Sequence, residues 1–491
     1  MNRQITRMAV VGLVLLAALI VGTTYWQAWA ASGLADRQDN SIQRVAQFTI
    51  KRGKIYAADG RTVLADNVRR KVGGQTLYFR KYPQRGLAAH IVGYSTQVRS
   101  RAGLEDTEND FLTGSNTNLS TVLDTTFDKL RGTTVKGNDL HLTLRAGAQA
   151  IALKALGGKC GAAVAIEPRT GRLLVSVSSP TYNPNLIEDQ YNLASRPKWG
   201  CGPLFNRAEQ GLYTPGSAFK VITASAALES GKFTIDSTFH DPGYCIEYGD
   251  KVSNFADQNG PEVFGTVNFT QALEHSINAV FCNIGLTLGG RKILEQARRF
   301  GFYSVPPLET PVNERAISGV YNNHRLFFPK EDSQVDSGRL AFGQGPANAD
   351  IKVTPIQMAM VAATIANGGL VMRPYVVERV VAPDGSTVTK TKPETLGRAV
   401  SENTAADVTT MMEAVVQGGT GTAAQLPGIR VAGKTGTAET SESHVNTTWF
   451  ICFAPAENPK VAVAVVLERQ SATGGTTAAP IAKQIMEALL P

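Results

Sequence analysis

Several patterns that assign a protein to a class are missing from this sequence. The 491 residues contain no low-complexity block and no internal repeat, and the composition, 43% hydrophobic and 18% charged, is that of a globular protein. No C-x-x-C pair and no histidine cluster is present, so we expect no structural metal site, and nothing else in the chain predicts a cofactor. No segment combines a basic cluster with interleaved aromatic residues, so the net charge of +8 predicts a basic surface rather than a nucleic-acid partner.

Charge is missing from a long stretch near the N-terminus. An uncharged run extends from Met8 to Ser32, long enough to cross a bilayer, and Arg3 and Arg7 precede it. Aromatic residues lie at its far end, as at a membrane interface: Tyr25, Trp26 and Trp29. The arginines predict a cytoplasmic N-terminus, so we expect a single-pass anchor in the cell membrane over residues 1–32 and an extracytoplasmic remainder. The alternative is a cleaved signal peptide, because small residues that suit cleavage are present: Ala28, Ala30 and Ala31.

Cysteine is scarce. The chain has five: Cys160, Cys201, Cys245, Cys282 and Cys452. Outside the membrane the compartment permits one or two disulfides, and the odd count leaves at least one cysteine without a partner in the chain. The favoured pair is Cys245 with Cys282, because both flank a motif described below. The alternative is that all five are buried thiols.

The chain is too long for one ordinary domain and changes character near residue 160. Residues 33–145 are polar, and within them KRGKIYAADGRTVLADN is typical of a strand, an Asp-Gly turn and a second strand. A strand and then a helix from about Ala146 follow. From residue 160, two apolar strands surround a Pro-Arg-Thr-Gly turn, and three more lie near the C-terminus, with helical segments between and after. This order predicts an antiparallel-rich sheet with helices on both faces.

The stretch YTPGSAFK, residues 213–220, is the first that carries chemistry. A Pro-Gly pair breaks the preceding structure, so a helix should begin at Ser217, with Lys220 on the same face. The residues that follow are apolar on almost every side, which predicts a buried helix and a buried lysine. Burial lowers the pKa of a lysine, and a neutral amine beside a hydroxyl is a general base that activates the serine as a nucleophile. The alternative is an ordinary serine N-cap beside a solvated lysine.

Ser-x-x-Lys is weak by itself. Ser195 and Lys198 repeat the spacing, but they lie in a loop with a proline inside, where no helix would hold the pair. A second motif, in HSINAVF, has Ser276 and Asn278 on either side of Ile277. It also has a structural interpretation, a polar break in a helical stretch. The similar Ser-Glu-Asn at residues 401–403 is best explained as a helix cap.

A third motif occurs once, in GKTGTAE on a predicted strand. It comprises Lys434, Thr435, Gly436 and Thr437. By itself Lys434 is explained equally well as a charged residue on an edge strand. Ser-x-x-Lys, Ser-x-Asn and Lys-Thr-Gly in this order, outside the membrane, are the motif set of β-lactamases and penicillin-binding proteins, and the three together favour catalysis.

Longer stretches resemble the class B penicillin-binding proteins, and among them the actinobacterial PbpA type. They are RGKIYAADGRTVLA, the block with Gly103, Leu104 and Glu105, AIEPRTGRLLVSVSSPTYNPN, and FGQGPANADIKVTPIQMAMVAATIANGG. The resemblance implies an α+β fold, the penicillin-binding and serine β-lactamase-like transpeptidase domain. Its five-stranded sheet and helical subdomain would occupy residues 146–491. A mostly β pedestal would cover 33–145, after the anchor at 1–32. No glycosyltransferase domain fits before residue 145, which excludes class A.

Carried over to this sequence, the resemblance implies a role for each motif residue. Ser217 would be acylated by a stem peptide ending in D-Ala-D-Ala, with Lys220 as its base. Ser276 would relay a proton to the leaving D-Ala, and Asn278 would bind the peptide amide and orient Lys220.

The Lys-Thr-Gly strand would bind the substrate carboxylate. Lys434 would supply positive charge, and Thr435 and Thr437, on either side of Gly436, would hydrogen-bond the carboxylate. The backbone N–H groups of Ser217 and Thr437 would form the oxyanion hole. An amine of a second stem peptide would then attack the acyl-enzyme and cross-link the cell wall, whereas β-lactams would acylate Ser217 and stall there.

Two other functions use the same features. The motifs also permit a hydrolase, a D,D-carboxypeptidase or a β-lactamase-like enzyme, which the lifetime of the acyl-enzyme would distinguish. A non-enzymatic scaffold of a wall-synthesis complex is the third possibility. By analogy with the family we expect a polytopic glycosyltransferase of the RodA/FtsW kind as a partner, touching the anchor and residues 33–145.

Overall fold

The fold is that of a computed structural model, which describes residues 2–25, 48–115, 136–198, 200–257, 260–346, 349–439 and 445–490. The first helix, α1 (Asn2–Thr24), contains the segment Thr6–Thr24, which has a mean hydropathy of 2.1 and is not buried against the rest of the protein. Its length and composition suffice to cross a membrane, as the anchor prediction requires. Trp26 and Trp29 of the predicted aromatic belt lie outside the described residues.

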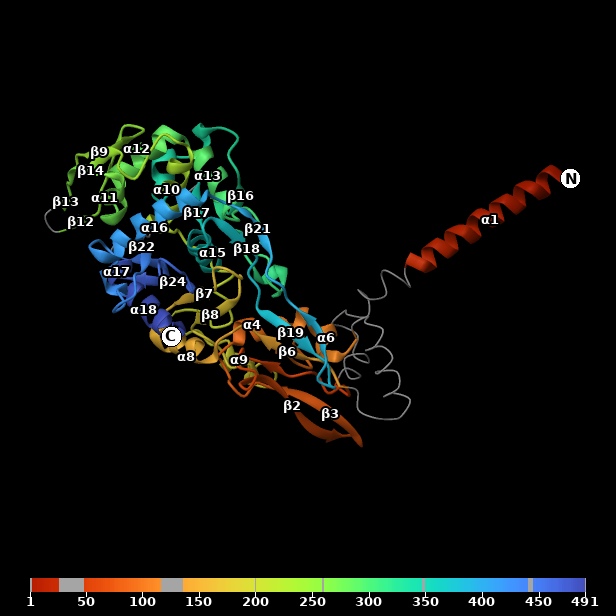
Figure 1. The fold of residues 1–491 in the computed structure, drawn as a ribbon. Helices are drawn as coiled ribbons and strands as arrows, with labels where there is room; N and C mark the ends of the chain where they lie inside the picture. Colours follow the sequence, from red (N-terminus) through yellow and green to blue (C-terminus); the bar gives the residue numbers. More distant parts are fainter. Residues whose placement is uncertain are drawn as a thin grey trace.

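A six-stranded sheet follows α1 in the chain, with the strand order β20-β19-β6-β1-β2-β3. Its strands β2, β3, β6 and β19 are labelled in Figure 1. Its strands are β1 (Ile55–Tyr56), β2 (Val63–Val72), β3 (Gln75–Lys81), β6 (Asp139–Leu142), β19 (Val377–Val381) and β20 (Thr387–Lys390). The Asp-Gly turn joins β1 to β2 as predicted, and the Asp59 carboxylate accepts from the N–H groups of Arg61 and Thr62. Three short helices pack nearby: α4 (Ala89–Val92), α5 (Leu104–Thr107) and α6 (Asn109–Thr113).

This sheet crosses the boundary that the sequence suggested at residue 145. The β19–β20 hairpin comes from the middle of the predicted transpeptidase region, yet β19 pairs antiparallel with β6 along the whole of that strand. The pedestal sheet is therefore completed by residues more than 200 positions downstream. The sequence partition at residue 145 separates strands that are hydrogen-bonded neighbours.

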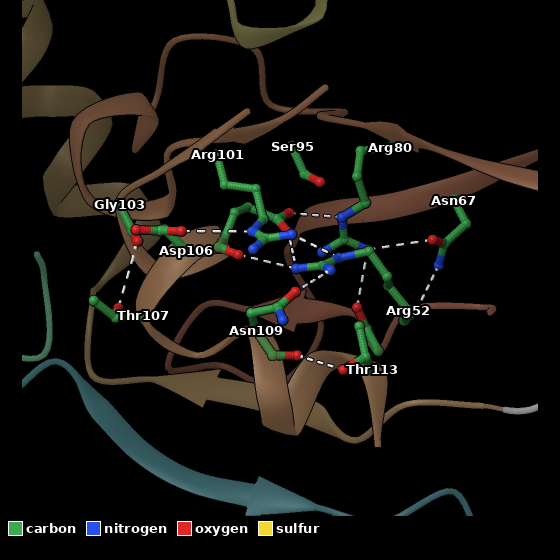
Figure 2. A network of polar contacts seen from close by, with 12 residues as sticks. Arg52, Asn67, Arg80, Ser95, Arg101, Gly103, Asp106, Thr107, Asn109 and Thr113 are labelled. Atoms are coloured by element: carbon green, nitrogen blue, oxygen red, sulfur yellow. Dashed lines mark hydrogen bonds and ion pairs between the residues drawn. The ribbon is translucent and has the colours of Figure 1, made fainter. Parts of the chain in front are cut away.

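A buried ionic cluster holds the pedestal together (Figure 2). The carboxylate of Glu105 is fully buried and lies between two arginines, 2.6 Å from Arg80 Nε and 2.9 Å from Arg52 Nη2. Arg52 also donates to Asn109 Oδ1 at 2.7 Å. Burial by itself would raise the pKa of Glu105, but the two guanidinium groups outweigh it and the pKa is lowered. Two stretches that resemble the family blocks, around residues 52 and 105, thus meet in one ion cluster.

A five-stranded antiparallel sheet forms the second part of the molecule, with the order β22-β23-β24-β7-β8. Its strands are β7 (Gly161–Ile166), β8 (Leu173–Ser179), β22 (Ala432–Glu439), β23 (Asn446–Ala454) and β24 (Val461–Gln470). Successive side chains alternate between two separate apolar cores, so that Phe450 and Cys452 enter one and Trp449 and Ile451 the other. This alternation explains why the central parts of β23 and β24 are apolar on both faces.

Helices cover both faces of this sheet, as predicted. On one face pack α8 (Ala146–Leu156) and α18 (Ala479–Leu489), which share a core with β24 and β8. The other face is covered by α10 (Lys220–Glu229), α15 (Pro355–Ala366) and α16 (Glu402–Gln417). The predicted α+β fold with a five-stranded sheet is confirmed.

A helical subdomain lies beyond α10, at the end of the molecule away from the pedestal (Figure 1). It contains α11 (Phe269–Glu274), α12 (Asn278–Leu288), α13 (Gly290–Arg299) and α14 (Ser337–Ala341), together with the hairpin of β10 (Tyr244–Glu247) and β11 (Asp250–Ser253) and the pair β9 (Thr238–Asp241) and β14 (Gly265–Asn268). The remaining short elements are β4 (Tyr94–Ser95), β5 (Arg101–Ala102), α9 (Tyr191–Ala194), β12 (Ala256–Asp257), β13 (Gly260–Pro261), β15 (Gly319–Asn322), β16 (Arg325–Phe327), β17 (Asp350–Lys352), β18 (Leu370–Met372), β21 (Thr395–Arg398), α17 (Gly474–Thr477) and the 3-10 turns Pro184–Leu186, Gly216–Phe219, Val312–Glu314, Asp332–Gln334 and Thr422–Ala424.

Candidate active site

Ser217 lies in the 3-10 turn Gly216–Phe219, which leads directly into α10. The regular helix thus begins three residues later than predicted, at Lys220, and its N-cap is Phe219, so the ordinary serine-cap interpretation does not apply. Gly216 has a φ of 53°, and a Cβ there would lie 2.6 Å from the carbonyl oxygen of Thr437. Glycine therefore allows the serine turn to approach β22 closely.

Lys220 is completely buried. Its Nζ donates to the backbone carbonyl of Ser276 at 2.6 Å and to Asn278 Oδ1 at 2.7 Å, and lies 3.3 Å from Ser276 Oγ. Burial, and after it the charge of Lys434, hold the pKa of Lys220 well below its usual value. The two N–H groups of a neutral amine are taken up by those two oxygens, which leaves its lone pair to accept a proton. The predicted burial of Lys220 is confirmed, and the structure places its amine against Ser276 and Asn278.

Ser276 and Asn278 occupy the break between α11 and α12. Ser276 has a φ of 61°, a left-handed conformation that non-glycine residues rarely adopt and that clusters at functional sites. Asn278 is the first residue of α12, and its Nδ2 donates to the carbonyl of Ser253 at 3.2 Å. The next N–H, of Ala279, donates to Asn254 Oδ1 at 2.9 Å. The β11 segment therefore holds the amide of Asn278 with its oxygen toward Lys220.

Lys434 lies on β22, which is an edge strand of the five-stranded sheet, as the alternative explanation from the sequence assumed. Its side chain, however, is fully buried. Nζ donates to Ser276 Oγ at 2.9 Å and to the carbonyl of Thr435 at 3.1 Å. Burial lowers the pKa of Lys434 to about 7. Two buried amines, from α10 and β22, thus converge on one serine hydroxyl.

These groups surround a cleft of about 640 Å³. Its lining includes Ser217, Ser276, Asn278, Thr435 and Thr437, and the two lysines are buried behind that surface. A Cβ at Gly436 would lie 2.6 Å from the carbonyl oxygen of Pro215, so glycine allows β22 to pass beside the serine turn. The structure therefore brings all eight predicted residues together at one site. Within the described part of the chain, no hydrogen bond joins the Ser217 hydroxyl to Lys220.

The chance matches to the motifs lie elsewhere. Ser195 follows α9, and its hydroxyl donates to the carbonyl of Tyr191 at 2.8 Å. Ser401 is the N-cap of α16 and accepts from the N–H of Thr404 at 3.1 Å, which confirms the cap prediction.

Four of the five cysteines form disulfides. The favoured pair, Cys245–Cys282, is present, and it ties β10 to α12 beside the Ser-x-Asn motif. A second bond, Cys160–Cys201, was not predicted, and Cys452 is a buried free thiol. The alternative of five thiols is therefore wrong.

Two residues at the site, Thr420 and Trp449, were not predicted from the sequence. Thr420 lines the cleft and its hydroxyl lies 2.7 Å from Thr435 Oγ1. Trp449 lies behind the serine turn and donates from Nε1 to the carbonyl of Thr214 at 3.0 Å. Single threonines and tryptophans carry no spacing signal, so only the fold reveals them.

Comparison with known proteins identifies the family. The Penicillin binding protein transpeptidase domain matches residues 161–487, and the Penicillin binding protein A dimerisation domain matches residues 52–140. The chain belongs to the penicillin-binding proteins. It is a class B member, with a dimerisation domain ahead of the transpeptidase domain.

Individual members of the family align along the whole chain. The peptidoglycan D,D-transpeptidase PbpA of Mycolicibacterium smegmatis is 36% identical, over 100% of this chain and 99% of its own. The PbpA of Mycobacterium tuberculosis is 34% identical with the same coverage. A ceftriaxone acyl-enzyme complex of penicillin-binding protein A from M. tuberculosis superimposes with a TM-score of 0.79 and 32% identity, covering 91% of this chain and 100% of that one. The D,D-transpeptidase domain from Eggerthella lenta gives a TM-score of 0.75 at 35% identity, covering 90% and 98%.

Proposed function

We propose that this penicillin-binding protein is a peptidoglycan D,D-transpeptidase in which Ser217 is the nucleophile. The observation that carries the proposal is the hydrogen-bonded row of Lys220, Ser276 and Lys434 behind one cleft, with Ser217 on the cleft surface. A half-buried hydroxyl on a cleft surface, near a buried amine of lowered pKa, is the arrangement that activates a serine for acyl transfer. The mycobacterial relatives are D,D-transpeptidases, and D,D-transpeptidation is the acyl transfer that these groups suit.

Acylation begins at Ser217. As Oγ attacks the carbonyl carbon of the penultimate D-Ala, neutral Lys220 accepts the hydroxyl proton, after a rotation that brings the two groups into contact in the complex. The carbonyl oxygen becomes negative and accepts from the backbone N–H groups of Ser217 and Thr437. The close packing of the serine turn on β22 supports this oxyanion hole. Loss of one such donor typically slows a reaction by about 10²–10³-fold.

Departure of the terminal D-Ala requires a proton on its nitrogen. The carbon–nitrogen bond breaks as the Ser276 hydroxyl gives up its proton to the leaving amine, and Ser276 is reprotonated from Lys220. The 3.3 Å and 2.9 Å distances from Ser276 Oγ to the two amines support this relay. Thr435 and Thr437 hydrogen-bond the carboxylate of the substrate, and buried Lys434 supplies positive charge behind them. Gly436 allows β22 to pass beside the serine turn, and Asn278 binds the peptide amide.

Cross-linking completes the cycle. The amine of a second stem peptide attacks the ester carbon, loses a proton to the Lys220–Ser276 relay, and displaces Ser217, whose hydroxyl is restored. A β-lactam acylates the same serine, but its leaving group stays attached, so the acyl-enzyme persists.

The test is labelling of purified protein with a fluorescent penicillin. We expect stable labelling of the wild-type chain and none of the Ser217→Ala variant, with Ser195→Ala as the matched control that still labels. Equal labelling of wild type and Ser217→Ala would contradict the assignment. The lifetime of the label separates the alternatives, because turnover of penicillin within seconds indicates the hydrolase.

The setting of this activity follows from the anchor. The helix over 6–24 would hold the protein in the cell membrane with the catalytic domain outside, where the stem peptides are. The chain would divide into an anchor over 1–32, a pedestal over 33–145 and a transpeptidase domain over 146–491, whose β19–β20 hairpin pairs with the pedestal sheet. The arginines before the anchor support that orientation. A RodA/FtsW-type glycosyltransferase is the proposed partner at the anchor and pedestal. It should co-purify with the full chain, and replacement of the anchor by an unrelated helix should abolish co-purification.

A further inference from the structure

Thr420 belongs to none of the three motifs, yet it lines the cleft beside Thr435, where the proposed function places the substrate carboxylate. It sits in the loop that follows α16, among the glycines at 418, 419 and 421. This loop is fitted tightly: a Cβ at Gly419 would lie 2.3 Å from the carbonyl oxygen of Glu274, and one at Gly475 would lie 2.3 Å from that of Thr420. The backbone of Thr420 is therefore fixed between α11 and α17, with its side chain on the cleft surface.

Within the described residues, the Thr420 hydroxyl has one partner, Thr435 Oγ1, at 2.7 Å. Thr435 in turn receives a second contact, from Lys434 Nζ at 3.3 Å. A hydroxyl oxygen has two lone pairs and one proton, so the direction of the Thr420–Thr435 bond decides where the Thr435 proton points.

Two arrangements exist. If Thr435 donates to Thr420, its only proton is used between the two threonines and no donor remains for a substrate. If Thr420 donates, Thr420 and Lys434 occupy both lone pairs of Thr435, and the Thr435 O–H turns into the cleft. A bound carboxylate stabilises the second arrangement, because a hydrogen bond to an anion is roughly twice as strong as one between neutral groups.

We propose that Thr420 is a positioning residue that donates to Thr435 Oγ1 and thereby directs the Thr435 proton at the carboxylate of the acyl donor, whether stem peptide or β-lactam. This inference rests on the proposed transpeptidase function. Recognition of the carboxylate then depends on the Thr420 hydroxyl, which lies outside the motifs and acts on the substrate only by orienting the Thr435 proton.

The experiment compares acylation by penicillin with acylation by penicillin methyl ester, which lacks the anionic carboxylate. Full-length wild type, Thr420→Val and Thr420→Ser are each measured with both compounds as second-order rate constants. We expect Thr420→Val to be about tenfold slower than wild type with penicillin, the loss of one well-directed hydrogen bond to a charged group, and within about twofold of wild type with the ester. Thr420→Ser keeps the hydroxyl and should restore most of the rate.

Thr477→Val is the matched control, because Thr477 also pairs with a threonine hydroxyl, Thr448 Oγ1 at 2.9 Å, and neither residue lines the cleft. Its penicillin-to-ester ratio should equal that of wild type. Because the ratio is taken within each variant, partial unfolding cancels from it. Equal slowing with both compounds, no slowing, or failure of Thr420→Ser to recover each overturns the proposal. Absence of wild-type acylation would instead contradict the transpeptidase function itself.

Discussion

Removal of the Lys434 charge should shift the pH dependence of acylation to higher pH. The acylation rate of the free enzyme needs a neutral Lys220, so it rises as the pH passes through the lowered pKa of this group. The positive charge of Lys434 is one of the causes that lower this pKa. Replacement of Lys434 by methionine removes that repulsion, so the pKa of Lys220 rises. The part of the pH–rate profile in which acylation speeds up, its rising limb, then moves to higher pH.

The size of the shift follows from the geometry. Bonds of 2.9 and 3.3 Å from the two amines meet at Ser276 Oγ, so the nitrogens are at most about 6 Å apart, where two charges at an effective dielectric of about 20 interact by about 3 kcal/mol. That energy corresponds to about 2 pH units. The pKa of Lys434 itself is about 7, so Lys434 loses its positive charge above neutral pH and the repulsion weakens there. We therefore expect the pH dependence of acylation to move upward by about one to two pH units.

The assay is the second-order rate constant for a fluorescent penicillin, measured across the pH range in which the protein stays folded. The rate of Lys434→Met will also be lower at every pH, so the position of the limb, and not its height, is the readout. Lys251→Met is the control, because this cleft-lining lysine is exposed and its charge is screened by water. An unchanged limb, or one at lower pH, would refute the electrostatic coupling of the two amines.

Three further predictions concern single structural features. Glu105→Gln leaves two buried arginines without their anion and should lower the free energy of unfolding by about 3–5 kcal/mol in urea titrations, while the acylation rate of the folded protein stays unchanged. Gly436→Ala places a Cβ 2.6 Å from the carbonyl of Pro215, so penicillin labelling should slow at least about tenfold with little change in circular dichroism. Cys245→Ser combined with Cys282→Ser opens a loop spanning 37 positions and should cost about 4 kcal/mol of stability, seen as a lower thermal midpoint than that of wild type, a difference that disappears when reductant opens the disulfides of both proteins.

Part of the site was predictable because its motifs are local. Ser217 and Lys220 lie one turn apart, and a Pro-Gly break followed by an apolar helix fixes their environment without knowledge of the rest of the fold. The same holds for Gly436, whose place between two threonines on a strand is set by sequence alone. The two apolar strands that begin near residue 160, the three near the C-terminus and the helices between them likewise predicted one antiparallel-rich sheet with helices on both faces.

The remainder depends on contacts between distant segments. No characteristic spacing in the sequence signals that Lys220 and Lys434 converge on Ser276, or that Thr420 pairs with Thr435. Each of these contacts joins residues from different elements. The same reason hides the β19–β20 hairpin that completes the pedestal sheet, and the Cys160–Cys201 bond.

The order of amino acids specifies which groups are available: the apolar N-terminal helix, the motif residues and the order of the strands. The protonation state of those groups depends on how the chain packs. Lys434 is indistinguishable in sequence from a solvated edge-strand lysine, and it is burial behind the cleft that lowers its pKa to about 7. A lysine becomes a base or a proton relay through desolvation and neighbouring charge, and both are properties of the packed protein.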